Sequence, residues 1–289
     1  MVEEHAPVVF ALSASFTFAL AAHIQNLGLR DGDWRTATLI IMATTAGLYW
    51  LAAPFIIAPS YWWTGACGLF VLAGLFRPAL SISFWVKGIQ MLGPTLNATL
   101  SAGSPLFAAM FGILLLGESM TLPVALGTLA VFAGALAAAW RPGGTKLDWP
   151  MWAVLLPLAA TFLRNIAHAI TKIGFEEVPS PLFAGLVSTT VSLVLVGAYF
   201  FAQGVRCDLP RRDIGLLVLS GALNALAVYL LNAALSVGKL IVVAPILAVS
   251  PVFAMMLSLL VFRRDVITWR KVLTLCLVVP GVILVILSG

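Results

Sequence analysis

The sequence has very little charge, and no acidic residue lies inside any of its long apolar segments. Only 9% of the 289 residues are charged, 62% are hydrophobic, and the mean hydropathy is +1.08. All eleven acidic residues fall at the termini, in loops or at segment ends. This composition excludes a soluble globular domain and predicts an all-α polytopic membrane protein.

The missing membrane carboxylates restrict the chemistry as well as the fold. A proton-coupled exporter of organic cations needs a carboxylate within the membrane that alternates between proton and substrate. Without one, the sequence predicts neither that mechanism nor a membrane-embedded metal, and we expect no cofactor. The cysteines have no metal-binding spacing, so we expect neither zinc nor a disulfide from Cys67, Cys207 and Cys276. The net charge of +5 comes from basic residues at segment ends, which suits membrane orientation and not nucleic-acid binding.

Apolar runs long enough to cross a bilayer follow one another along the chain, separated by short loops. We predict ten transmembrane helices, at roughly 7–28, 35–58, 63–88, 94–116, 121–140, 149–174, 181–203, 211–236, 240–262 and 267–287.

The two halves of the sequence match at one constant spacing. Adding 146 to the residue number takes Ser104-Pro105 to Ser250-Pro251, and Gly28 to Gly174. We therefore predict two five-helix repeats, residues 1–144 and 145–289. Because five is an odd number, the second repeat enters the membrane from the opposite side. The fold expected is ten helices in two inverted repeats around a central cavity.

The basic residues agree with this inversion. They gather in the loops after the first, third, fifth, seventh and ninth helices, whereas the other loops have only Lys172 and Lys239 nearby. By the positive-inside rule the basic loops are cytoplasmic. We expect a multi-pass protein of the cell (inner) membrane with both termini on the external or periplasmic side.

Polar residues inside the apolar segments form two stripes. In the sixth helix, TFLRNIAHAITK at 161–172 places Thr161, Asn165 and His168 on one face, with Arg164 beside them. The third helix has a similar stripe, made of Gly74, Arg77, Ser81, Trp85 and Gly88. Both stripes are expected to face the interior of the helix bundle, because lipid offers them no partner.

Two arginines lie near the middle of their helices, where a charge costs about 2.5–3.5 kcal/mol. Arg77 and Arg164 have no acidic neighbour in the membrane, so we expect them to face an aqueous cavity and to meet a substrate carboxylate. The alternative is that they bind backbone carbonyls freed by kinks at Pro78 and Pro157. Lys172 is expected to reach the interface. His23 and His168 fit packing and substrate contact equally well.

Small residues and prolines have structural interpretations. A small-residue stripe in the fifth helix predicts close helix contact and consists of Gly127, Ala130, Gly134 and Ala138. Pro105 and Pro251 occupy equivalent positions and are expected to kink the fourth and ninth helices, as hinges or as static bends.

One stretch carries a family resemblance. SPLFAAMFGILLLGES at 104–119, followed by the small-residue helix, resembles the drug/metabolite transporter superfamily, in its EamA-like ten-helix branch. The second copy, SPVFAMMLSLLVFRRD, has Arg263-Arg264 in place of Gly117-Glu118. Within this branch the chain looks most like YddG-type exporters of aromatic amino acids.

The resemblance implies a monomer whose central cavity is surrounded by helices 1, 3, 4, 6, 8 and 9 and braced by helices 5 and 10. It also implies where the substrate binds. By helix position, the residues expected in the cavity are Arg77, Ser81, Phe84, Trp85, Asn97, Ser101, Arg164, Asn165, His168 and Asn224.

The function expected is export of amino acids, aromatic or otherwise apolar, or of related small metabolites, by alternating access. No acidic residue lies within these segments, and His168 is the one residue there suited to carrying a proton. Facilitated diffusion is therefore favoured over proton coupling. The alternative is a multidrug or organic-cation exporter of the same superfamily. An intramembrane enzyme is disfavoured because the segments contain no nucleophile–base pair. A channel is disfavoured because it is a less natural function for an inverted repeat without an oligomeric pore.

Overall fold

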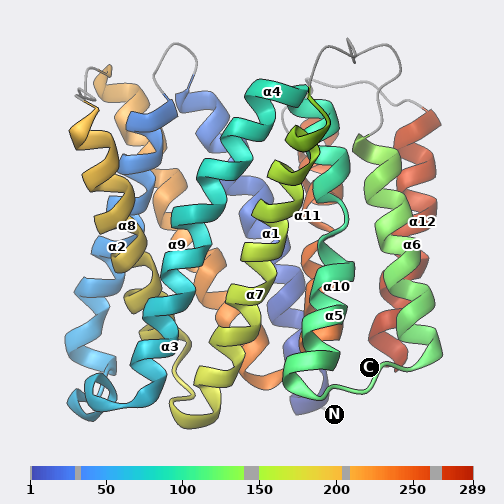
Figure 1. Ribbon diagram of the computed structural model, residues 1–289, viewed down its shortest axis with the longest axis horizontal. Helices are drawn as coiled ribbons and strands as arrows, with labels where there is room; N and C mark the ends of the chain where they lie inside the picture. Colours follow the sequence, from blue (N-terminus) through green and yellow to red (C-terminus); the bar gives the residue numbers. More distant parts are fainter. Residues whose placement is uncertain (1, 30–33, 140–149, 204–208, 261–268, 289) are drawn as a thin grey trace.

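The computed structural model describes residues 2–29, 34–139, 150–203, 209–260 and 269–288. Over these ranges the chain is helical, with no strand (Figure 1). The first half contains α1 (Val2–Gly28), α2 (Trp34–Ile56), η1 (Pro59–Trp63), α3 (Gly65–Gly74), η2 (Leu75–Leu80), α4 (Ser81–Ser101), α5 (Ser104–Leu116) and α6 (Leu122–Ala139). The second contains η3 (Met151–Val154), α7 (Leu155–Glu177), α8 (Pro181–Ala202), α9 (Arg211–Val237), α10 (Leu240–Leu247), α11 (Ser250–Leu260) and α12 (Trp269–Ser288).

The helices make the ten predicted crossings. Eight stretches are long and apolar enough to span a membrane, and two shorter apolar helices, Leu122–Ala137 and Val272–Leu287, complete the set within the described residues. The third and fourth crossings, Gly65–Gly93 and Leu96–Leu116, meet within α4, where the chain bends at Gly93 with non-helical backbone angles. Gly93 has φ +80, a left-handed conformation that glycine adopts without a steric cost.

Equivalent helices of the two halves run in opposite directions. In Figure 1, α1 rises from the lower end, where the chain begins, and α7 descends toward that end. The helix breaks also obey the predicted spacing: α4 ends at Ser101 and α10 at Leu247, and the next helices begin at Ser104 and Ser250. The prolines therefore follow matched interruptions of the fourth and ninth crossings, as predicted.

Helix packing follows the same pseudo-symmetry. α1 lies along α9, and its counterpart α7 lies along α3 and α4. α6 and α12 pack against each other at one edge of the bundle (Figure 1). There the predicted small-residue contact is confirmed, because a Cβ on Gly127 would lie 2.5 Å from the carbonyl oxygen of Gly281.

The lower end of the bundle is tightly packed. The largest apolar cluster includes Phe70 of α3, Phe175 of α7 and Phe183 of α8, whose rings meet at centroid distances of 5.6 and 5.8 Å around Phe70. Leu235 and Leu240 from the α9–α10 corner join the same cluster. These residues close the bundle at the end where the chain begins. Of the cysteines, Cys67 and Cys276 are free thiols, and Cys207 lies outside the described residues.

Candidate functional site

A cavity of about 780 Å³ lies between the two halves, bordered by α1, α2, η2 and α4 to α11. Its volume falls in the range that holds small organic molecules. The lining is mainly apolar, with polar side chains at intervals. Eight of the ten expected residues line it: Arg77, Ser81, Trp85, Ser101, Arg164, Asn165, His168 and Asn224.

Arg77 lies at a break in the third crossing. It has φ −135 and ψ 121, outside the helical region, and Pro78 follows it. The carbonyl oxygens freed at this break accept hydrogen bonds from Ser192 of α8, at 2.6 Å for Gly74 and 3.3 Å for Arg77 itself. A hydroxyl from the other half therefore satisfies these carbonyls, and the guanidinium remains in the cavity wall.

The second arginine approaches the first from the opposite half. Arg164 of α7 lies over the ring of Trp85 of α4, with Cζ 5.7 Å from the ring centroid. This geometry is a cation–π contact, which stabilises by about 0.5–2 kcal/mol depending on solvent exposure. Arg77 and Arg164 both border the same cavity. Within the described part of the chain neither guanidinium has an ion-pair partner.

Two amides connect elements across the cavity. Asn165 Nδ2 donates to Ser104 Oγ at 3.0 Å and to the carbonyl of Thr161 at 2.8 Å, which joins α7 to the start of α5. Asn224 Nδ2 of α9 donates to Thr45 Oγ1 of α2 at 3.2 Å. Each amide therefore joins one half of the protein to the other.

Two expected residues lie elsewhere. Phe84 is exposed on the outer surface of α4, because it lies about 100° around the helix from Trp85. Asn97 is fully buried in the contact between the third and fourth crossings, where a Cβ on Gly88 would lie 2.1 Å from Asn97 Oδ1. Neither borders the cavity in this structure, so the expectation that they line it is not met, and their contact with substrate stays a prediction.

The cavity wall also has residues that the sequence reasoning missed. Most are hydroxyl or apolar side chains at mid-membrane depth, among them Phe18, Thr45, Ser104, Ser188, Thr189 and Ser250. Ser104 and Ser250 carried a usable signal, because each opens a helix directly before a proline at equivalent places in the repeat. Serine and threonine elsewhere in membrane helices give no such signal, since they bond to their own helix, as Thr189 does with Gly185.

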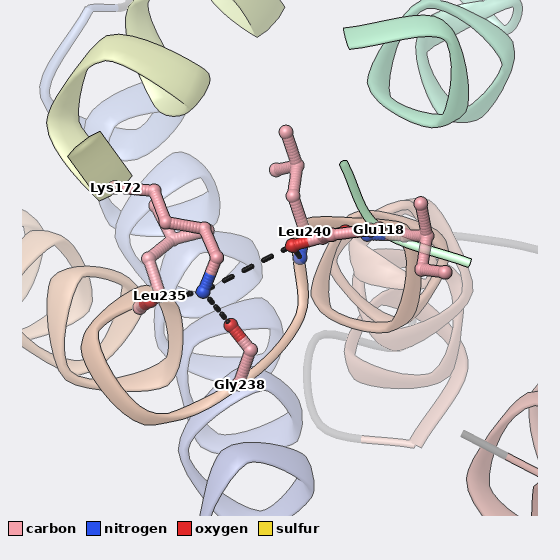
Figure 2. A network of polar contacts seen from close by, with 6 residues as sticks. Glu118, Lys172, Leu235, Gly238 and Leu240 are labelled. Atoms are coloured by element: carbon pink, nitrogen blue, oxygen red, sulfur yellow. Dashed lines mark hydrogen bonds and ion pairs between the residues drawn. The ribbon is translucent and has the colours of Figure 1, made fainter. Parts of the chain in front are cut away.

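A polar cluster joins the end of α5 to α7 and to the α9–α10 corner (Figure 2). α5 ends at Gly117, which has φ +63, and the next residue, Glu118, turns toward the second half. Its two carboxylate oxygens accept hydrogen bonds from the backbone N–H groups of Leu240 and Ile241, at 2.7 and 2.9 Å. The carboxylate caps the first turn of α10, where the helix dipole favours negative charge.

Lys172 completes this cluster. Its Nζ donates to the carbonyls of Leu235 and Gly238 and lies 3.9 Å from Glu118 Oε1 (Figure 2). It therefore binds the end of α9 while the carboxylate binds the start of α10. His23 also has a structural partner, with Nε2 2.7 Å from the carbonyl oxygen of Ala254 in α11.

Among the residues described, no group of three or more histidine, cysteine, aspartate or glutamate side chains is arranged to hold a metal ion. The site therefore consists of two cations, neutral polar groups and apolar surface. Such a wall suits reversible binding of a small molecule.

Comparisons with known proteins agree with this arrangement. The chain matches the EamA-like transporter family twice, over residues 5–140 and 151–287. The two matches begin at the same spacing as the internal repeat. A curated relative, an uncharacterized inner membrane transporter YicL of Salmonella typhimurium, is 40% identical over 58 residues. That match spans 20% of this chain and 19% of the relative.

A solved crystal structure of a protein shares the fold over nearly the whole chain. It superposes with a TM-score of 0.79 at 15% sequence identity, covering 96% of this chain and 95% of the other. The arrangement of helices is therefore one already seen in a solved protein. Family and relative both point to a transporter and not to an enzyme.

Proposed function

The chain belongs to the EamA-like transporter family of multi-pass membrane proteins, and from this premise we propose that it exports amino acids or related small metabolites. Substrate would bind in the central cavity, and alternating access between the two halves would carry it across an inner membrane. The two repeats proposed are residues 1–144 and 145–289. The cavity is bordered by both halves of a single chain, which supports a monomer in the bilayer as the working unit.

The cavity between the halves, with Arg77 and Arg164 in its wall, carries this proposal. A carboxylate placed there pairs with guanidinium groups, and such charge-assisted hydrogen bonds are stronger than neutral ones. Trp85 and Phe18 offer aromatic surface to an apolar side chain of the substrate. The same two charges disfavour an organic cation, which is the alternative substrate class.

Uncoupled transport is the energetics proposed. No aspartate or glutamate is found among the described residues of the cavity wall, so a proton would have to use His168. The test is substrate-driven pH change in proteoliposomes that contain the purified protein. Export without a stoichiometric proton flux supports facilitated diffusion, and a fixed proton-to-substrate ratio rules it out.

The substrate class is tested by uptake of a panel of labelled amino acids into the same vesicles. Arg77→Ala and Arg164→Ala are expected to reduce uptake at least tenfold, because each removes one pairing group. Lys87→Ala is the matched control, since Lys87 is exposed on α4 and outside the cavity. Full transport by both arginine variants would assign these side chains a structural role only.

A further inference from the structure

The charge of the cavity wall is unbalanced. Arg77 and Arg164 contribute two positive charges, and the described residues of the wall include no aspartate, glutamate or other charged group to offset them. The four acidic side chains that the structure describes lie elsewhere. Glu118 caps α10, Glu177 caps α3 through the N–H groups of Gly65 and Ala66, and Glu176 and Asp213 lie at helix ends.

We propose that the cavity takes a small organic anion with two acidic groups, and binds it in preference to a neutral zwitterion. The inference rests on the proposed function and names the substrate class of that same site. A dicarboxylate and a phosphate monoester both meet this description. Each brings the negative charge that neutralises the pair of guanidinium groups.

The hydroxyl groups near the arginines favour an anion as well. Ser104 Oγ accepts a hydrogen bond from Asn165, so its own O–H remains available to donate. Ser101 Oγ is buried without a hydrogen-bond partner. Both border the cavity, and each can donate to an acidic oxygen.

The interrupted helices do not decide the charge preference. At the break in the fourth crossing, Ala102 N donates to Ala98 O, and the N–H groups of Leu106 and Phe107 donate to Gly103 O. The backbone groups there are largely satisfied by one another. The selectivity therefore depends on the side chains, above all on the two guanidinium groups.

A zwitterion fits this wall less well than a dianion. Its ammonium group would find only neutral acceptors, such as the amide oxygens of Asn165 and Asn224, and would face two cations of its own sign. One carboxylate would also leave one arginine without a counter-charge. Charges in a cavity with apolar walls are screened less than charges in water, so this difference affects affinity strongly.

The test measures binding and charge movement separately. Thermal unfolding of the purified protein is followed with succinate, glycerol phosphate, phenylalanine and tetraethylammonium, because a ligand raises the unfolding temperature more, the more tightly it binds the native state. Net uptake of labelled succinate, of labelled glycerol phosphate and of labelled phenylalanine into proteoliposomes is then measured at imposed membrane potentials. Carrier-mediated movement of a net anion responds to the potential, whereas movement of a zwitterion does not.

The dianions are expected to stabilise the protein at concentrations at least tenfold lower than phenylalanine, and one of them to show potential-dependent net uptake. Succinate alone indicates a carboxylate site, and glycerol phosphate alone a phosphate site. Arg77→Gln and Arg164→Gln are each expected to weaken dianion binding at least tenfold and to narrow the gap to phenylalanine. Lys87→Gln, which removes an exposed charge on α4 in the same crossing as Arg77, is expected to change neither quantity.

Two outcomes overturn different statements. Phenylalanine binding as tightly as the dianions, with potential-independent net uptake, refutes the dianion site and leaves the amino acid exporter standing. Absence of binding and uptake for every compound, in a protein that unfolds cooperatively, contradicts both. Equal binding of tetraethylammonium would favour the organic-cation class instead.

Discussion

Lys172 Nζ lies 3.9 Å from Glu118 Oε1, and between them these side chains bind both sides of the α9–α10 corner. Glu118 belongs to the first half of the chain, whereas α9 and α10 belong to the second. The contact therefore joins the halves at the closed end of the bundle, below the cavity. Movement of the halves in alternating access would have to separate these groups.

Glu118→Ala removes a carboxylate that accepts two backbone hydrogen bonds at a helix start. We expect it to lower the free energy of unfolding by about 2–4 kcal/mol, since hydrogen bonds to a charged group contribute about 1.5–3 kcal/mol each and are not fully additive. Thermal or urea unfolding in detergent measures this. Glu176→Ala, at an exposed position near the same end, is the control, and an equal loss there would contradict a specific capping role.

Ser192→Ala tests how the break at Arg77 is supported. Loss of the 2.6 Å hydrogen bond to Gly74 O leaves a buried carbonyl unpaired, at a cost of about 1–3 kcal/mol in stability. We also expect weaker substrate binding, because Arg77 follows this carbonyl by three residues. The control is Ser83→Ala, whose hydroxyl bonds only within its own helix. Unchanged stability in Ser192→Ala would show that water replaces the hydroxyl.

Trp85→Leu tests the cation–π contact across the cavity. Removing the ring beneath Arg164 should weaken substrate binding about 3-fold to 30-fold, which corresponds to the free energy of such contacts. KM and kcat are measured separately in vesicle transport. Weaker binding raises KM, whereas a general loss of folded protein lowers the apparent kcat and leaves KM unchanged. Phe84→Leu, one residue earlier on the exposed face of α4, should leave KM unchanged.

Gly127→Ala tests the contact between α6 and α12. The added methyl group would lie 2.5 Å from the carbonyl of Gly281 and 2.7 Å from Val285, so the helices must separate. We expect a loss of about 1–3 kcal/mol, typical of overpacking. Gly47→Ala on α2 is the matched control, because its added methyl group meets nothing within 4 Å. A loss in both variants would indicate a general effect of the substitution.

The global fold could be predicted from the sequence because the bilayer restricts the alternatives. The length of the apolar runs predicted the membrane-crossing helices, and the repeated Ser-Pro pair predicted how the two halves of the sequence align. Arg77 and Arg164 were predicted at the cavity because a mid-membrane charge with no acidic neighbour needs an aqueous surrounding.

Other parts of the site depend on details that periodicity does not specify. The reversal at Gly93 presses Asn97 against Gly88, which removed an expected contact from the cavity. The partner of Lys172 was missed for a different reason. Glu118 is neither close to Lys172 in the sequence nor related to it by the predicted repeat, and only the three-dimensional packing brings them together.

The sequence of the other half does not repeat the carboxylate with which Glu118 caps α10. The repeat spacing that relates the halves carries Glu118 to Arg264, and it carries Leu240, whose N–H the carboxylate binds, to Pro94, which has no N–H to offer. Arg264 has no acceptor oxygen, so the same carboxylate cap cannot form at the matched positions, and the two closed forms would differ in energy despite their shared architecture. The transporter proposed here would be more stable in the conformation that keeps the Glu118–Lys172 contact. Substrate that binds from the other side would have to supply the free energy that breaks this contact.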